Sequence, residues 1–146
     1  MHTQLLGDLK YPVGYHMDTN KSKILYMMEV LRDTVGKDTP ISLWCRGSSG
    51  AIIAAIISTG FDNCIINHVK KEGEESHSTH EFNTDRSRKH IIVDDFIRSG
   101  KTVNAIYLEM LRCSLSVDYL CVFECVYECN LKFIPKNVIS ERYVTR

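Results

Sequence analysis

The chain has 146 residues, of which 44% are hydrophobic, 25% are charged and 3 are proline. This length is typical of one domain, and this composition excludes a disordered or collagen-like chain. Eighteen basic residues balance eighteen acidic ones, so the chain lacks the large positive charge that sequence-independent binding to nucleic acid requires. We therefore expect no nucleic-acid partner, and an anion would have to be bound by a local site.

Neither a membrane span nor an export signal is predicted. The apolar run at 52–57 is much shorter than a membrane helix, and no basic stretch leads into a long apolar one near Met1. The six cysteines include no C-x-x-C pair and no histidine at zinc-ligand spacing. We expect a cytoplasmic protein without a membrane partner, whose cysteines are buried free thiols.

Hydrophobic periodicity predicts most elements of the fold. Apolar residues recur at helical spacing in segments that begin near capping residues or end at glycine, and short runs rich in β-branched residues indicate strands. In chain order, the predicted elements are an irregular segment 1–20, a helix 21–36 with capping candidates at 18–20, a strand 41–45, a helix 51–59, a strand 63–69, a strand 90–95, a helix 101–113 and a strand 119–127.

A long polar segment, 70–89, separates two of the predicted strands, and Phe82 is its one strongly apolar residue. A stretch of this length without secondary structure in a compact domain is typical of a functional loop. His77 and His80 in this segment, and His90 after it, show no pattern of partners. We predict that they are loop or surface residues.

Strands that alternate with helices predict an α/β fold: an open, mostly parallel twisted sheet with helices on both faces. The strand 90–95 is apolar without alternation, as expected for a strand buried on both faces. Ligands in such sheets bind at the carboxyl ends of the strands. Two loops there, 46–50 and 94–102, leave a strand and enter a helix.

The segment 94–102 combines two acids at a strand end, a turn of small residues and a helix start. Backbone N–H groups, the helix dipole and the hydroxyls of Ser99 and Thr102 form a cradle for phosphate. Because carboxylates repel phosphate, Asp94 and Asp95 should face sugar hydroxyls or a divalent cation. A phosphorylated sugar satisfies both halves of the segment.

Two other interpretations of this segment remain. The tripeptide at 100–102, Gly-Lys-Thr, matches the end of a nucleotide-binding P-loop, but Asp95 stands at the position of the first glycine, where its carboxylate would point into the phosphate nest. The acids could also be a solvated pair without a ligand.

The run Ile91-Ile92-Val93-Asp94-Asp95-Phe96-Ile97-Arg98-Ser99-Gly100-Lys101-Thr102 resembles the phosphoribosyl-pyrophosphate (PRPP) motif of the type I phosphoribosyltransferases, which include orotate and purine enzymes. The resemblance implies that the two acids hold the ribose hydroxyls and are catalytic. It also implies that the rest of the segment completes the ribose and 5′-phosphate site, namely Phe96, Ile97, Arg98, Ser99, Gly100, Lys101 and Thr102.

The sequence departs from that motif at two positions. Phe96 is bulkier than the usual valine or isoleucine, and Arg98 stands where a small residue or, in hypoxanthine-guanine enzymes, an acidic base is found. Either another group assists the purine N7, or the base is not a 6-oxopurine.

The same resemblance assigns the pyrophosphate to two further loops. The first follows the strand 41–45, and the second begins with Val69-Lys70-Lys71-Glu72-Gly73, which is similar to the start of a mobile catalytic loop in orotate and adenine enzymes. Lys71 would be catalytic, although Lys70 and Lys71 could also be an exposed charge run. The implied pyrophosphate contacts are Arg46, Gly47, Ser48, Ser49, Lys70, Lys71, Ser76 and His77.

The implied reaction is displacement of pyrophosphate from PRPP by a ring nitrogen of a nucleobase. Mg²⁺ would be the cofactor, held mainly by substrate oxygens and water and only indirectly by Asp94 and Asp95. A single domain, 1–146, would have a core at about 21–129 and a small or truncated base-binding hood from 1–20, 130–146 or both. A homodimer is expected by analogy with the family.

Two other classes of function remain. One is a regulatory protein of the same fold that binds PRPP without turning it over. The other is an RNA-binding attenuator, for which the four Lys or Arg against one Glu in 130–146 give thin support. Release of pyrophosphate in the presence of a base distinguishes an enzyme from both.

Overall fold

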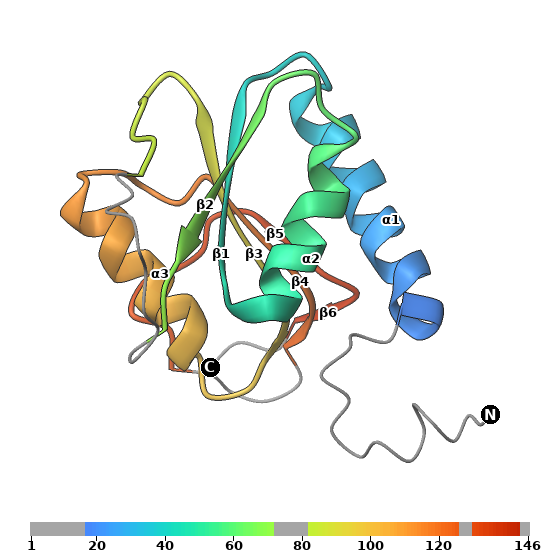
Figure 1. Cartoon of the computed structure of the whole chain (residues 1–146). Helices are drawn as coiled ribbons and strands as arrows, with labels where there is room; N and C mark the ends of the chain where they lie inside the picture. The colour runs from blue at the N-terminus through green and yellow to red at the C-terminus, as the bar shows by residue number, and fades with distance from the viewer. Residues whose placement is uncertain (1–16, 72–81, 126–129, 144–146) are drawn as a thin grey trace.

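The computed structural model describes residues 17–71, 82–125 and 130–143 (Figure 1). Its parallel sheet has the order β2-β1-β3-β4-β5, and β6 also pairs with β4. The helices are α1 (Met17–Val35), α2 (Gly47–Ser58) and α3 (Lys101–Arg112), and the strands are β1 (Ile41–Arg46), β2 (Cys64–Val69), β3 (Lys89–Ile97), β4 (Tyr119–Cys125), β5 (Val138–Ile139) and β6 (Arg142–Tyr143).

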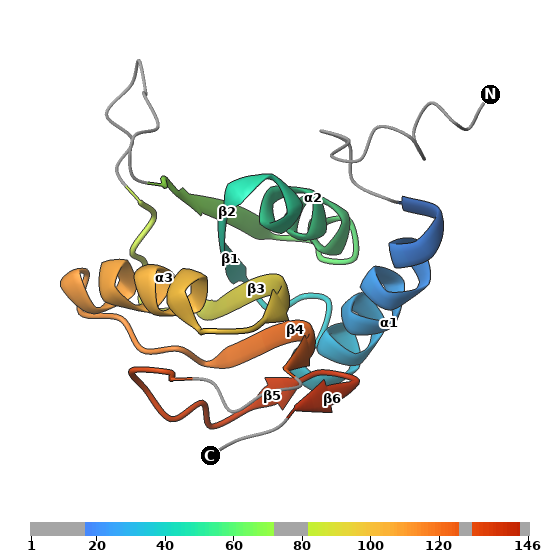
Figure 2. The same ribbon diagram turned by 90° about the horizontal axis from the view of Figure 1, so that it is seen from below.

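Helices cover both faces of the sheet (Figure 2). Ile24 of α1 and Ile53 of α2 pack with Ile91 of β3 on one face. On the other face, Ile106 of α3 packs with Ile92 of the same strand. Because alternate residues of β3 enter opposite cores, the strand is buried on both sides, and the α/β class predicted from the sequence is confirmed.

The strand order reverses direction between β1 and β3. The chain leaves β1 through α2 to reach β2 on one side, whereas β3 lies on the other side of β1 and continues through α3 to β4. Ile41 to Trp44 of β1 pair with Lys89 to Ile92 of β3. The loops after β1 and β3 therefore diverge to opposite faces, and a crevice between them is the usual ligand site of such sheets.

Several boundaries differ from the predicted ones. The first helix begins at Met17, so the capping candidates 18–20 lie inside it. Helix α2 begins at Gly47 instead of 51, and β3 continues to Ile97. Strands β5 and β6, which fall in the candidate hood 130–146, were not predicted because each is two residues long and carries no periodic signal.

The prediction that His90 is a surface residue is wrong. His90 is 2% exposed, and its Nδ1 accepts a hydrogen bond of 3.0 Å from Trp44 Nε1. Its Nε2 then carries the proton and donates to the Asp85 carbonyl at 2.8 Å. The partner Trp44 is distant in the sequence, so no local pattern pointed to this contact.

The cysteines of the described ranges are free thiols, as predicted, but only Cys45, Cys121 and Cys125 are buried, whereas Cys64 and Cys113 are half-buried. Burial raises the pKa of Cys121 to about 12, so this thiol is protonated and unreactive at neutral pH. None of the helices in the described ranges has both the length and the apolar character needed to cross a membrane.

Arg88 fixes the entry to β3 from inside the fold. The side chain is 8% exposed, and its guanidinium donates to Ser42 Oγ at 3.1 Å, to the Ile41 carbonyl at 2.6 Å and to Asn63 Oδ1 at 2.9 Å. These bonds join the start of β3 to β1 and to the turn before β2. Removal of the guanidinium would leave the buried Ser42 hydroxyl and Ile41 carbonyl without this donor.

We predict that Arg88→Ala lowers the free energy of unfolding by about 2–3 kcal/mol, because it strands buried acceptors. The neighbouring Arg86 is exposed, so Arg86→Ala should change stability by less than about 0.5 kcal/mol. Urea unfolding followed by fluorescence of Trp44, the single tryptophan, measures both. Equal midpoints for the two variants would contradict this role of Arg88.

Candidate functional site

Two glycines with positive φ introduce the helices that follow β1 and β3. Gly47, the first residue of α2, has φ +80°, and Gly100, the N-cap of α3, has φ +88°. Side chains other than hydrogen strain the backbone in this region. Each glycine turns the chain sharply from strand to helix, so that the unbonded N–H groups of two helix starts lie at the carboxyl edge of the sheet.

A hollow of about 200 Å³ lies at the start of α3. Asp94, Thr102 and the turn 98–100 all line it. Within the turn, Ser99 Oγ accepts the Lys101 N–H at 3.3 Å. The predicted phosphate segment is thus brought together around one cavity, whose lining consists of Asp94, Phe96, Ile97, Arg98, Ser99, Gly100, Thr102 and Val103.

The two acids have different environments. Asp94 is buried, 6% exposed, whereas Asp95 is half-buried and its Oδ1 accepts the Phe96 N–H at 2.7 Å. Burial, and next the charge of Asp95, raise the pKa of Asp94 to about 8, while the charge of Lys71 acts in the opposite direction. Asp94 is therefore largely protonated at neutral pH in the free protein.

Lys71 links the start of α2 to the acids near the end of β3. A Cβ on Gly47 would lie 2.9 Å from Lys71 Cε and 3.2 Å from Lys71 Nζ, so the lysine side chain lies against the glycine. Its charge also acts on Asp94. On the same side, Arg46 Nε donates to the Lys70 carbonyl at 3.5 Å. The structure thus places Arg46, Gly47, Lys70 and Lys71 in one wall beside the acids.

Of the other residues predicted to contact the pyrophosphate, two are described by the structure and two are not. Ser48 and Ser49 lie in the first turn of α2, where the N–H groups have no partners within the helix. Ser76 and His77 lie outside the described residues.

Two side chains at this edge were missed by the sequence analysis. His68 Nε2 lies 3.4 Å from the Gly47 carbonyl, because His68 pairs in register with Cys45. Lys23 Nζ of α1 lies 5.6 Å from the ring centroids of both Phe96 and Phe123. Neither residue belongs to a local sequence motif. The only signal in the sequence was that His68 falls near the end of a predicted strand and Lys23 falls in a predicted helix.

The acids are compatible with a cation held largely by a ligand. The described residues contain no group of three or more His, Cys, Asp and Glu side chains that could hold a metal ion. Asp94 supplies the one carboxyl group that lines the hollow, and Asp95 is the next residue of β3. A buried carboxyl beside a second acid gains from a nearby positive charge. Such a site fits Mg²⁺ that brings most of its ligands from substrate and water.

No family model and no curated protein matches this sequence. Solved structures do match its fold. A hypoxanthine-guanine phosphoribosyltransferase from Bacillus anthracis aligns with a TM-score of 0.63 at 10% identity, over 89% of this chain and 79% of that one. A purine phosphoribosyltransferase from Pyrococcus horikoshii aligns with a TM-score of 0.61 at 15% identity, over 86% and 85%.

A third match is a hypothetical protein from Neisseria gonorrhoeae with bound ppGpp, with a TM-score of 0.63 at 17% identity over 90% of this chain and 82% of that one. Identities this low establish the fold alone. The chain has the type I phosphoribosyltransferase fold, as the resemblance of 91–102 predicted.

The raised pKa of Asp94 predicts a pH-dependent cost in stability. An acid whose pKa is higher in the folded than in the unfolded protein lowers the stability of the protein as the pH rises from the lower pKa to the higher one. For Asp94 these pKa values are about 3.9 in the unfolded chain and about 8 in the folded protein. Asp94→Asn removes this loss. We predict that the free energy of unfolding of Asp94→Asn, relative to that of the wild type, rises by roughly 2–3 kcal/mol between pH 5.5 and pH 8.5.

Chemical unfolding of both proteins in buffers free of divalent cations measures this difference, and titrating groups that do not interact with Asp94 cancel in the comparison. A difference between the two proteins that stays constant over this pH range would contradict the raised pKa.

Proposed function

We propose that this protein is a phosphoribosyltransferase, which transfers the phosphoribosyl group of PRPP to a nucleobase and releases pyrophosphate. One observation carries the proposal: Asp94 lines the hollow that contains the turn 98–100 and is within reach of the charge of Lys71, whose side chain lies against Gly47. PRPP has the matching order of groups, with a phosphate, two ribose hydroxyls and a diphosphate.

The 5′-phosphate would be bound at the start of α3. The N–H groups of the turn and the hydroxyls of Ser99 and Thr102 donate to its oxygens, and the exposed Arg98 and Lys101 add positive charge. The ribose hydroxyls would donate to Asp94 and Asp95. Donors that approach Asp94 favour its ionised form, so the bound sugar would offset part of the cost of its charge.

The diphosphate would lie against the start of α2. The N–H groups of Gly47, Ser48 and Ser49 face it, with charge from Arg46 and Lys71 and further contacts from Lys70, Ser76 and His77. When the bond from the anomeric carbon to the diphosphate oxygen breaks, the diphosphate takes the electron pair. These cations and N–H groups stabilise that charge, and Mg²⁺ supplies further positive charge on the diphosphate when bound.

The ribosyl carbon becomes positive as the diphosphate leaves, and the nearby carboxylates of Asp94 and Asp95 stabilise it while a ring nitrogen of the base forms the new bond. Closure of the segment that follows Lys71 would exclude water, which competes with the base. The base would be recognised by a small hood from 1–20 and 130–146, and the protein would act as a homodimer.

The purine phosphoribosyltransferases among the matching folds favour a purine, whereas Arg98 in place of an acidic base favours a different base. The structure with bound ppGpp supports a second candidate, a protein of this fold that binds a phosphorylated ligand as a regulator without turnover. Incubation with Mg²⁺, PRPP and a panel of purines and pyrimidines, analysed by mass spectrometry for nucleotide and pyrophosphate, separates the two. Binding of PRPP without pyrophosphate release from any base would support the regulator and overturn the enzyme.

The double variant Asp94→Asn with Asp95→Asn should weaken PRPP binding at least about 100-fold, because it removes both charged acceptors from the ribose. Isothermal titration calorimetry measures this. The matched control is Glu29→Gln with Asp33→Asn, which removes two exposed acids of α1 and should leave affinity unchanged. If the first pair binds PRPP as wild type does, the assignment of the acids is wrong.

A methyl group on Gly47 tests the diphosphate wall. Gly47→Ala strains a residue with φ +80° and would push Lys71 away, so PRPP should bind about tenfold more weakly. Gly36→Ala is the control, since Gly36 has φ +93° and a comparable backbone cost but contacts Thr39. Both variants should lose about 1 kcal/mol of stability, and equal PRPP affinities in the two would contradict the role of this wall.

A further inference from the structure

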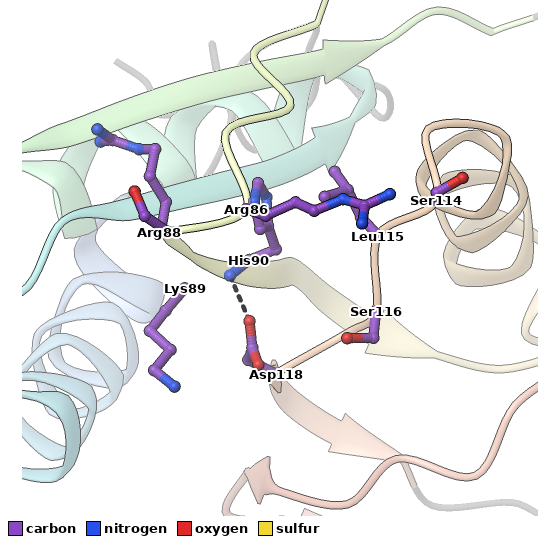
Figure 3. Close-up of a pocket in the computed structure, with 9 residues that line it drawn as sticks. Arg86, Arg88, Lys89, His90, Ser114, Leu115, Ser116 and Asp118 are labelled. Atoms are coloured by element: carbon purple, nitrogen blue, oxygen red, sulfur yellow. Dashed lines mark hydrogen bonds between the residues drawn. The ribbon is translucent and has the colours of Figure 1, made fainter.

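A second and larger hollow, of about 310 Å³, lies at the amino ends of β3 and β4 (Figure 3). Its walls are the loop that enters β3 and the segment 114–118 that joins α3 to β4. Residues of β3 line both hollows, with His90 nearest in this one and Asp94 nearest in the candidate active site. The four residues between these positions separate them by about 13 Å at a rise of about 3.3 Å per residue. The proposed reaction makes no use of this second hollow.

Hydrogen bonds hold the walls of this hollow in a fixed arrangement. The His90 N–H donates to Asp118 Oδ2 at 2.8 Å, and the Asp118 N–H donates to the His90 carbonyl at 2.9 Å. In the opposite wall, Asp85 Oδ1 accepts from both the N–H and the hydroxyl of Ser87. A binding site whose walls are already held by hydrogen bonds loses little conformational entropy when it binds a ligand.

Positive charge predominates around the hollow. Three cationic residues line it against one carboxylate, Asp118, which the His90 N–H already engages. The Arg88 guanidinium is buried and bonds to Ser42, Ile41 and Asn63, away from the hollow, so Arg86 and Lys89 are the cations that a ligand there could reach (Figure 3). Asp85, a second acid beside the hollow, has its pKa lowered by the bonds from Ser87 and further by Arg88.

Arg86 and Lys89 are exposed and lack an acidic partner. Across the described ranges 17–71, 82–125 and 130–143, the only ion pair joins Arg112 and Glu109. Figure 3 shows Arg86 extended from its loop toward Ser114 and Leu115, with Ser116 on the same side. Lys89 extends away from these residues, so it lies at the rim of the space that Arg86 and Ser116 share (Figure 3). Leu115 is the one apolar lining residue.

We propose that this hollow is a second binding site, for a small phosphate-bearing anion, with Arg86 as its main charged donor, the hydroxyl of Ser116 as a further donor and Lys89 as a second positive charge at its rim. The scarcity of apolar lining opposes a nucleobase, whereas donors without acceptors match phosphate oxygens. The inference does not depend on the proposed transferase activity, because it uses none of the residues at the carboxyl edge.

Trp44 gives a direct readout. Its indole N–H, the only one in the chain, donates to His90 in the floor of the hollow. Titration of ¹⁵N-labelled full chain with inorganic phosphate, at ionic strength kept constant with NaCl, should shift this resonance along a saturable curve. Ribose 5-phosphate, as a second ligand, shows whether a phosphate ester or free phosphate binds more tightly.

The double variant Arg86→Gln with Lys89→Gln should weaken this binding about tenfold or more, since each lost charge-assisted bond removes affinity. Lys21→Gln with Lys37→Gln removes two exposed charges elsewhere and should bind as wild type does. Lys101→Gln, at the other phosphate hollow, should also leave the Trp44 shift intact. Because the first two positions are exposed, an unchanged melting temperature confirms that the variant is folded.

A Trp44 resonance that stays in place throughout the phosphate titration would overturn the proposal. So would a shift that survives unchanged in the Arg86→Gln, Lys89→Gln protein, or one that disappears in Lys101→Gln. Failure of PRPP binding or turnover, by contrast, would count against the transferase and leave this site unaffected.

Discussion

The parallel pairing of β1 with β3 is the constraint on which the rest of the structure depends. These strands are neighbours in the sheet although α2, β2 and a long segment separate them in the chain. The helices that follow them cover opposite faces, so two helix starts diverge from adjacent strand ends (Figures 1 and 2). A ligand between them can meet N–H groups from both, which neither loop could supply alone.

Opposite charges lie close together at the carboxyl edge of the sheet. The chain has no net charge, yet Asp94 is buried beside Asp95, and Lys71 lies between Asp94 and Gly47. The cost of burying Asp94 falls on the free protein, and a ligand that brings hydroxyl donors or a cation would recover part of it. Strain of this kind is typical of sites selected for binding rather than for stability.

Features whose sequence signals lie within one segment of the chain could be predicted from the sequence. The apolar run of β3, the acids after it and the small residues before α3 are contiguous, so fold class and phosphate segment could be predicted together. Two other features depend on partners distant in the chain: the buried His90 bonds to Trp44, and the buried Arg88 bonds to acceptors of β1. Helix α2 begins at Gly47, within a run of glycine and serine that has low helix propensity, so tertiary packing sets that boundary.

A crystal structure of the protein with PRPP and Mg²⁺ tests the central claim most directly. The account predicts electron density for the 5′-phosphate within the turn 98–100, the ribose hydroxyls on Asp94 and Asp95, and the diphosphate against Gly47 and Lys71. PRPP bound in another place or in the reverse orientation, or a carboxyl edge without density in crystals soaked at saturating PRPP, would contradict it.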